Sequence, residues 1–197
     1  RAINRFREYG RKVSKNDTRT AWVLKGDIRK FFASINHQIL FNILKKHLDD
    51  TDVLWLFREI VVSFHTETGK GLPLGNLTSQ LLINIYMNEL DQFVKRKLKI
   101  KFYIRYADDF VILHRDKKYL ERLVPILSEF LEKELMLTLH PKKLFIKTLA
   151  SGVDFLGWVH FPKYRILRTS TQRRMFKKLN NNSKHESLVS YLGLLEH

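Results

Sequence analysis

The chain of 197 residues contains no cysteine, only four prolines and eight glycines, and no apolar run approaching the length of a membrane span. Without cysteine, a disulfide framework and thiolate metal sites are excluded, so a metal should be held by oxygen ligands, as magnesium and manganese are. No signal peptide is visible. We therefore expect a cytoplasmic protein with no membrane partner. Apolar residues make up 44% of the chain, enough for one globular domain with a buried core.

Acidic residues are also scarce, since 20 Asp and Glu stand against 36 Lys and Arg, which gives a formal net charge of +16. Such an excess indicates a polyanionic partner, and nucleic acid is the first candidate. The charge is concentrated in residues 1–19 and 163–178. For any single cation in these segments, a solvated surface is the alternative interpretation.

Two adjacent carboxylates, Asp108 and Asp109, lie between segments 102–106 and 110–113, which are rich in aromatic and β-branched residues. This pattern predicts a β-hairpin with an acidic tip. Neighbouring carboxylates repel each other unless a cation neutralises them. An ordinary Asp-containing turn is the alternative, and residues elsewhere in the chain must decide between the two.

Residues 21–27 predict a strand that ends at Asp27. Apolar spacing predicts four helices, over residues 37–48, 52–64, 78–98 and 117–135. Asn36 and Asp116 are the expected N-caps of the first and last of these, and Pro125 either kinks the last helix or begins a second segment. The stripe of the second helix consists of Val53, Leu56, Phe57, Ile60, Val61 and Phe64. Short strands are expected over residues 136–140, 144–148, 153–161 and 164–167.

The strand at 21–27, the helix at 78–98, the hairpin, the helix at 117–135 and the strand at 136–140 follow a β-α-β-β-α-β order. This order predicts an α+β fold with a ferredoxin-like antiparallel sheet backed by helices on one face. The first strand and the hairpin are then neighbours, which brings Asp27 beside Asp108 and Asp109. Three converging carboxylates are what two-metal phosphoryl transfer requires.

Three segments together resemble reverse transcriptases. Residues 25–32 (KGDIRKFF) look like the family's first catalytic motif, residues 106–109 (YADD) like its tyrosine-x-Asp-Asp box, and residues 155–158 (FLGW) like its primer grip. The resemblance covers about residues 21–167 and implies a polymerase palm. It also implies a two-metal reaction with two Mg²⁺, or Mn²⁺ as substitute, in which a dNTP is joined to the 3′-hydroxyl of a DNA or RNA primer on an RNA template.

The resemblance assigns roles to individual residues. Asp27 and Asp108 would be the principal metal ligands, the Ile28 carbonyl would assist, and Asp109 would contribute more weakly. Lys143 resembles the family's lysine that can protonate pyrophosphate, although Lys142 is a rival and a solvated lysine is an alternative. The primer-binding residues would be Phe155, Leu156, Gly157 and Trp158.

The same resemblance predicts the nucleotide site. Phe32 matches the family's steric gate, in which a flat ring under the sugar rejects a 2′-hydroxyl, and a core aromatic is the alternative. Lys30 and Phe31 would offer backbone amides to the triphosphate. Residues 71–80 (GLPLGNLTSQ) occupy the place of the loop that contacts template and nucleotide. In that loop we expect contacts from Leu74, Gly75 and Asn76.

This loop departs from the common bacterial pattern, because Leu74 and Gln80 stand where most members read Gln and Pro. The Leu-Gly-x-x-x-Ser-Gln form resembles the enzymes of diversity-generating retroelements, which copy a template RNA with errors at adenines. A group II intron maturase or a retron polymerase is the near alternative. An accessory retroelement protein is a further expected partner.

We expect residues 1–20 to be a basic remnant of the fingers, 21–167 the palm, 168–194 the start of a thumb, and 195–197 the remnant of an expression tag. A basic thumb helix near residues 171–179 would place its cations on a duplex backbone. These cations are Arg173, Arg174, Lys177 and Lys178. A rival from another class is a noncatalytic RNA-binding module on a polymerase-like scaffold.

Overall fold

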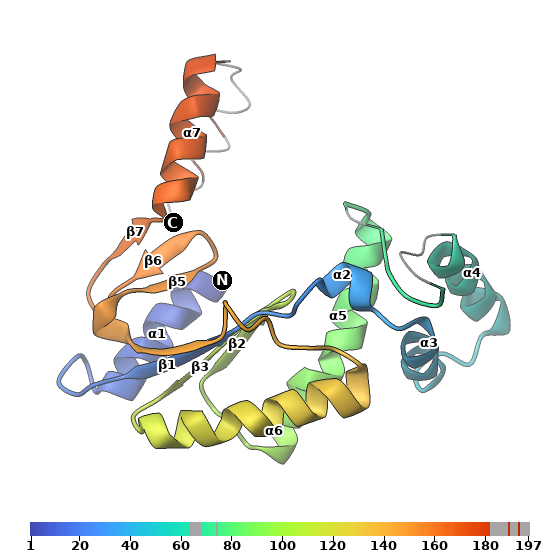
Figure 1. Cartoon of the computed structure of the whole chain (residues 1–197), viewed down its shortest axis with the longest axis horizontal. Coiled ribbons are helices and arrows are strands. Elements are labelled where there is room, and N and C mark those ends of the chain that lie inside the picture. Colours follow the sequence, from blue (N-terminus) through green and yellow to red (C-terminus); the bar gives the residue numbers. More distant parts are fainter. Residues whose placement is uncertain (64–67, 74, 182–188, 190–192, 194–197) are drawn as a thin grey trace.

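A computed structural model describes residues 1–63, 68–73, 75–181, 189 and 193. The helices are α1 (Ala2–Ser14), α2 (Phe31–Ser34), α3 (His37–Lys45), α4 (Thr51–Val62), α5 (Leu77–Gln92), α6 (Lys117–Leu135) and α7 (Thr169–Asn181). A π-helical turn (Phe93–Lys97) extends α5, and a 3₁₀ turn covers Leu149–Ser151. The strands are β1 (Trp22–Gly26), β2 (Tyr103–Tyr106), β3 (Asp109–His114), β4 (Phe145–Thr148), β5 (Val153–Phe155), β6 (Trp158–His160) and β7 (Arg165–Leu167). Figure 1 shows their arrangement.

The central sheet is antiparallel and has the strand order β2-β3-β1-β4. This is the order of a ferredoxin-like sheet, so the predicted α+β fold with an antiparallel sheet is confirmed. β1 pairs with β3 so that Gly26 lies opposite Phe110. Asp27 therefore leaves the end of β1 at the level of Asp109, beside the hairpin tip.

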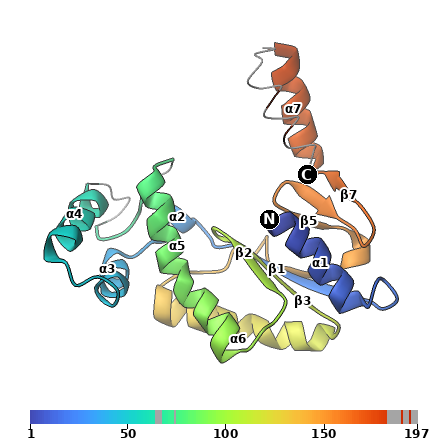
Figure 2. The ribbon, with the colours of Figure 1, turned by 180° about the vertical axis from the view of Figure 1, so that it is seen from behind.

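Alternate residues of the central strands enter two separate cores. Leu24 and Ile112 face the larger core, which the helices α5 and α6 cover. Val23 and Val111 face a second core, which is closed by Phe6 of α1 and by the β5–β6 hairpin. Figure 2 shows α1 on the side of the sheet away from α6. The sheet thus has a helix on each face, whereas the sequence predicted helices on one face.

The fourth strand of the sheet is β4, so the predicted strand over residues 136–140 is wrong. Met136 ends α6 with a positive φ of 49°, and Leu139 makes only an isolated bridge to Ile28. Leu137 and Leu139 are buried, and their burial explains the apolar alternation that suggested a strand. The predicted strand over residues 153–161 is divided at Leu156 and Gly157 into the hairpin of β5 and β6.

The apolar stripe predicted for α4 is only partly confirmed as a core face, since Phe57 and Val61 turn inward as predicted but two other members do not. Val53 and Leu56 are 37% and 53% exposed. The residues that turn inward are Leu54, Phe57 and Val61, because α4 packs beside α3 at the outer edge of the molecule. Phe64, the last residue of the predicted stripe, lies outside the described residues.

The other helix predictions are close to the observed bounds. Asn36 caps α3 by accepting a hydrogen bond from the Ile39 amide at 3.0 Å. Asp116 caps α6, which continues through Pro125. In the described part of the chain, no helix is long and apolar enough to cross a bilayer. The segment 195–197, predicted to be a tag remnant, lies outside the described residues.

Gly26 has no room for a side chain, since a Cβ there would lie 2.4 Å from the Phe110 ring. We expect Gly26→Ala to lower the free energy of unfolding by about 1–3 kcal/mol, the usual cost of overpacking a core. Denaturant titration measures this loss. Gly193→Ala is the control, because a Cβ there meets nothing within 4 Å. Equal stability of the two variants would contradict this account of the β1–β3 contact.

Candidate active site

The three predicted acidic residues meet where β1 ends and the β2–β3 hairpin turns. Asp27 is almost fully buried, and Lys143 Nζ donates to its Oδ1 and Oδ2 at 3.0 and 2.9 Å. The backbone of Asp27 is also fixed, because its carbonyl accepts from the His140 amide at 2.7 Å. The segment that follows α6 therefore brings Lys143 to the end of β1.

Asp109 forms an ion pair with a different lysine from the one that pairs with Asp27. Lys25 Nζ lies 3.3 Å from Asp109 Oδ2, and the Lys25 side chain is only 9% exposed. The other oxygen, Oδ1, is buried and has no hydrogen-bond partner. A buried carboxylate oxygen without a donor is costly, so this atom is a candidate contact for a cation that enters the site.

The electrostatics of the site follow from burial and from like charges. Burial raises the pKa of the Asp108 carboxyl, and the negative charges of Asp27 and Asp109 raise it further, against a backbone hydrogen bond that lowers it. Burial also raises the pKa of Asp109, while Lys25 lowers it. The hydrogen bond to Asp27 raises the pKa of Lys143. Together, three carboxylates and two ammonium groups leave one negative charge uncompensated.

The donor chemistry of the site fits a hard divalent cation, since it offers carboxylate oxygens and a backbone carbonyl. Asp27 and Arg29 make the hydrogen bonds of the bridge between Ile28 and Leu139, so that bridge does not use the Ile28 carbonyl. Among the described residues, no group of three His, Cys, Asp or Glu side chains is already arranged to hold a metal. In this conformation Lys143 bonds both oxygens of Asp27 and Lys25 contacts one oxygen of Asp109, while the other oxygen of Asp109 has no donor.

The two phenylalanines of the first motif have different surroundings. Phe31 is buried in the larger core, whereas Phe32 is partly buried and packs edge-on against it, with 5.7 Å between ring centroids. Lys30 precedes α2 with a positive φ of 47°. The Phe32 carbonyl accepts from the Leu72 amide at 2.9 Å, so the predicted nucleotide loop is attached to the segment that carries Phe32.

In that loop, Gly75 is exposed and has a φ of +82°, a conformation that glycine adopts readily. Asn76 caps α5 by accepting from the Thr78 amide at 3.0 Å. Its side chain therefore has a structural role that the sequence did not predict. Leu74 lies outside the described residues.

The predicted primer grip is the tight turn between β5 and β6. Phe155 and Trp158 are paired and buried, so they support the turn from inside. Leu156 and Gly157 form the turn with φ values of 53° and 83°, as in a type I′ turn. The Gly157 carbonyl accepts from the Arg168 amide at 3.0 Å, which joins this turn to the start of α7.

Helix α7 extends away from the rest of the structure (Figure 1). The side chains of Thr171 and Met175 are buried at its base. Its predicted phosphate-binding residues, Arg173, Arg174, Lys177 and Lys178, are all exposed. These cations are therefore not brought into contact with the acidic cluster and form a separate basic surface.

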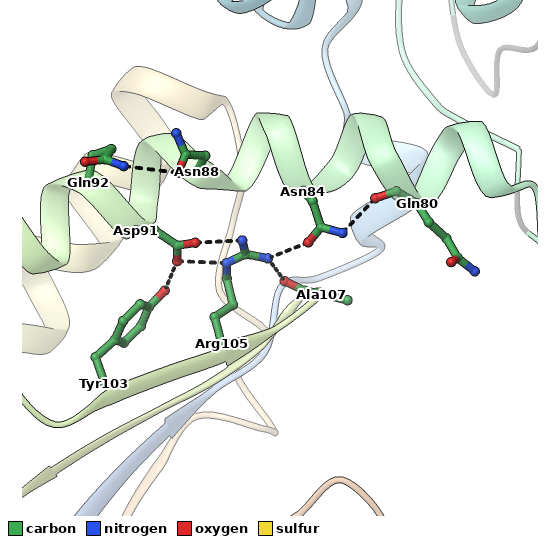
Figure 3. Close-up of polar contacts among 8 residues, drawn as sticks. All are labelled: Gln80, Asn84, Asn88, Asp91, Gln92, Tyr103, Arg105 and Ala107. Atoms are coloured by element: carbon green, nitrogen blue, oxygen red, sulfur yellow. Dashed lines mark hydrogen bonds and ion pairs between the residues drawn. The ribbon is translucent and has the colours of Figure 1, made fainter. Parts of the chain in front are cut away.

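Sequence reasoning missed two cations that support the acidic residues. The sequence shows Lys25 only as part of a motif, although a single cation in the apolar strand β1 is a signal for pairing with an acid. Arg105, in β2, bonds Asp91 of α5 and the carbonyl of Ala107 in the acidic turn (Figure 3). The partner Asp91 is distant in sequence, so no local pattern indicated it.

The raised pKa of Asp108 leads to a stability prediction. Burial and like charge disfavour the ionised carboxylate in the folded state. The ionised Asp108 therefore lowers the folding stability by its full amount at neutral pH, and this loss disappears below the ordinary Asp pKa of about 3.9. We expect Asp108→Asn to raise Tm at pH 7 by about 2–4 °C, as ~1 kcal/mol does in a domain of this size. The gain should vanish near pH 3 in thermal melts. Exposed Asp49→Asn is the control, and a gain that persists at pH 3 would contradict the cause.

Comparison with known proteins places this geometry in a family. The chain is 27% identical to Protein YkfC of Escherichia coli (strain K12), over 72% of this chain and 47% of that protein. It is 28% identical to the group II intron-encoded protein LtrA of Lactococcus lactis subsp. cremoris, over 85% of this chain and 39% of that protein. The chain thus spans less than half the length of either relative.

Solved structures share the fold. A telomerase from Candida albicans, in complex with the TWJ fragment of telomeric RNA, superposes with a TM-score of 0.63 at 13% identity, over 85% of this chain and 33% of that one. The family model described as reverse transcriptase (RNA-dependent DNA polymerase) matches residues 2–160. That match includes all three acidic residues and the three strands that position them, and it shows that the chain belongs to the reverse transcriptase family.

Proposed function

We propose that this chain is the palm of an RNA-directed DNA polymerase, which joins a dNTP to the 3′-hydroxyl of a DNA or RNA primer on an RNA template. The observation that carries the proposal is the convergence of Asp27, Asp108 and Asp109 at one edge of a palm-type sheet. Membership of the reverse transcriptase family supports the same reaction.

Asp27 and Asp108 would hold two Mg²⁺ ions, for which Mn²⁺ can substitute, with help from Asp109 and the Ile28 carbonyl. Bound divalent metals lower the pKa of an attacking hydroxyl and stabilise the charge of the leaving pyrophosphate. Lys143 is half-exposed beside these ligands, and its raised pKa keeps its proton at neutral pH. The pairing with Asp27 makes Lys143 a weaker acid, so Lys143 would give its proton to the pyrophosphate only after Asp27 turns to the metal.

The nucleotide would lie between the acidic cluster and the loop that is attached to α2. Phe31 is fixed in the core, which leaves the ring of Phe32 available to pack under the sugar. Lys30 and Phe31 would offer their amides to the triphosphate, and Gly75 permits close approach of the loop backbone. The contact proposed for Asn76 is through its backbone, because its side chain caps α5.

The primer would rest on the turn at Leu156 and Gly157, which is held from behind by buried Phe155 and Trp158. The duplex would continue along α7, whose exposed arginines and lysines are residue types that contact phosphate oxygens. Residues 168–194 then act as the start of a thumb. Residues 1–20 remain assigned to the fingers, although α1 within them packs on the sheet.

Two subtypes of reverse transcriptase each have support. The likeness to a group II intron-encoded protein favours an intron-type enzyme. The sequence around Leu74 and Gln80 favours the error-prone type of diversity-generating retroelements, with an accessory protein as partner. Scoring misincorporation by template base distinguishes them, since errors concentrated at adenines belong to the second type alone.

The catalytic proposal predicts that the whole protein makes complementary DNA from a primed RNA template with Mg²⁺. Asp108→Ala should lower this activity by more than about 100-fold, since even outer-shell partners of metal ligands are worth 10–100-fold. Asp116→Asn is the matched control, because Asn also caps helices well. If the wild type is inactive and its RNA binding survives both chelator and Asp27→Asn, the noncatalytic RNA-binding alternative holds instead.

The proposal that α7 begins a thumb predicts a loss of duplex affinity that depends on salt concentration. Replacing both Arg173 and Arg174 by Ala should weaken binding of an RNA–DNA duplex and reduce the slope of log K against log salt by about 2, or ~0.9 for each lost phosphate contact. Fluorescence anisotropy at several salt concentrations measures the slope. The control replaces Lys45 and Lys46, exposed cations at the end of α3. An unchanged slope in the α7 variant would show that these α7 arginines do not contact the duplex.

A further inference from the structure

The acidic turn is joined to helix α5 by a nearly buried ion pair. Arg105 Nε donates to Asp91 Oδ1 at 2.9 Å, and Arg105 Nη2 donates to Asp91 Oδ2 at 2.8 Å. The two side chains are 8% and 21% exposed. Two parallel hydrogen bonds fix the plane of a guanidinium as well as its position. Arg105 is therefore held in one orientation by α5 (Figure 3).

The remaining side of the same guanidinium faces the turn. Arg105 Nη1 donates to the Ala107 carbonyl at 2.9 Å, and Asn84 Oδ1 lies 3.4 Å from the same nitrogen. Ala107 has a φ of +52°, a conformation that costs a residue with a Cβ roughly 1–2 kcal/mol. Its carbonyl belongs to the peptide that leads directly into Asp108. The contact thus restrains the backbone at the point where the two carboxylates are displayed.

Stability alone does not account for this arrangement. A buried ion pair costs desolvation, and well-packed apolar residues in its place are often equally stable or more so. Tyr103 also donates to Asp91 Oδ1, at 2.8 Å, and Figure 3 draws no bond from it to Ala107. Within this cluster, Arg105 is the member that reaches both the helix and the turn.

We propose that Arg105 is a positioning residue, which uses Asp91 as its anchor to fix the Ala107 carbonyl and thereby the directions of Asp108 and Asp109. The inference rests on the proposed function for the reaction that it serves. Its physical basis is that small displacements of reacting groups are costly, about 100-fold for a misplacement of 1 Å.

Through helix α5, the contact between Arg105 and Ala107 also links the acidic turn to the predicted nucleotide loop. Asn84, which lies beside Arg105, donates to the Gln80 carbonyl one turn earlier in α5 at 2.9 Å. The same helix is capped by Asn76, which lies in the predicted nucleotide loop. The acidic turn and this loop are thus attached to one rigid element, and Arg105 makes the attachment on the side of the turn.

The test compares Arg105→Lys with Tyr103→Phe. A lysine keeps the charge and one contact to Asp91, but as a point charge it cannot bond Asp91 twice and the Ala107 carbonyl as well. Tyr103→Phe removes a contact to the same Asp91 and leaves the turn contact intact. The two variants therefore separate loss of the cluster from loss of positioning.

For Arg105→Lys in the whole protein, assayed well below its Tm, we expect kcat to fall about 10–100-fold with little change in KM for the dNTP. Amides 107–109 should exchange hydrogen faster than in the wild type. Tyr103→Phe should lower Tm while kcat and exchange at these amides stay unchanged. Wild-type exchange in Arg105→Lys, or an equal loss of kcat in Tyr103→Phe, would overturn the proposal.

The exchange measurement also separates this inference from the proposed function. If the wild type makes no complementary DNA but Arg105→Lys still loosens amides 107–109 and Tyr103→Phe does not, the proposed reaction fails and the positioning contact stands. If the wild type is active and Arg105→Lys leaves both exchange and kcat unchanged, the reaction stands and the positioning role fails.

Discussion

Mutual repulsion among Asp27, Asp108 and Asp109 is the constraint on which the centre of this molecule depends. Like charges that are partly removed from water must be balanced by cations. In this structure Lys143 and Lys25 supply that balance, one from the segment after α6 and one from within β1. These two positive charges leave one of the three carboxylate charges uncompensated, and Asp109 Oδ1 has no hydrogen-bond donor. A cation placed at this oxygen would therefore compensate the remaining negative charge.

Holding the carboxylates together against this repulsion requires a rigid frame. β1 is packed on both faces, with Leu24 in one core and Val23 in the other, and Gly26 leaves no space beside Phe110. Strands fixed in this way cannot separate to relieve the charge. The second core includes α1 and the β5–β6 hairpin, so the elements that support the predicted primer turn also support the acidic cluster.

Much of this was accessible from the sequence. The hairpin, the strand before Asp27, the caps Asn36 and Asp116, and the topology that brings the three acids together all follow from local patterns. The error over residues 136–140 has a clear cause, since buried Leu137 and Leu139 give the alternation of a strand in a segment that makes only one bridge. The error in α4 concerns Val53 and Leu56, because the apolar pattern of a helix does not show whether another element packs over it.

The sequence by itself determined the fold class, the placement of β1 beside the acidic hairpin and the family, because these depend on residue types at short spacing. Only the tertiary structure decided which cations meet the carboxylates and which of two adjacent phenylalanines is buried. It also decided that Asp91 anchors Arg105 on the turn. Such contacts join residues that are distant along the chain, and their geometry depends on how helices pack on the sheet, which no local pattern records.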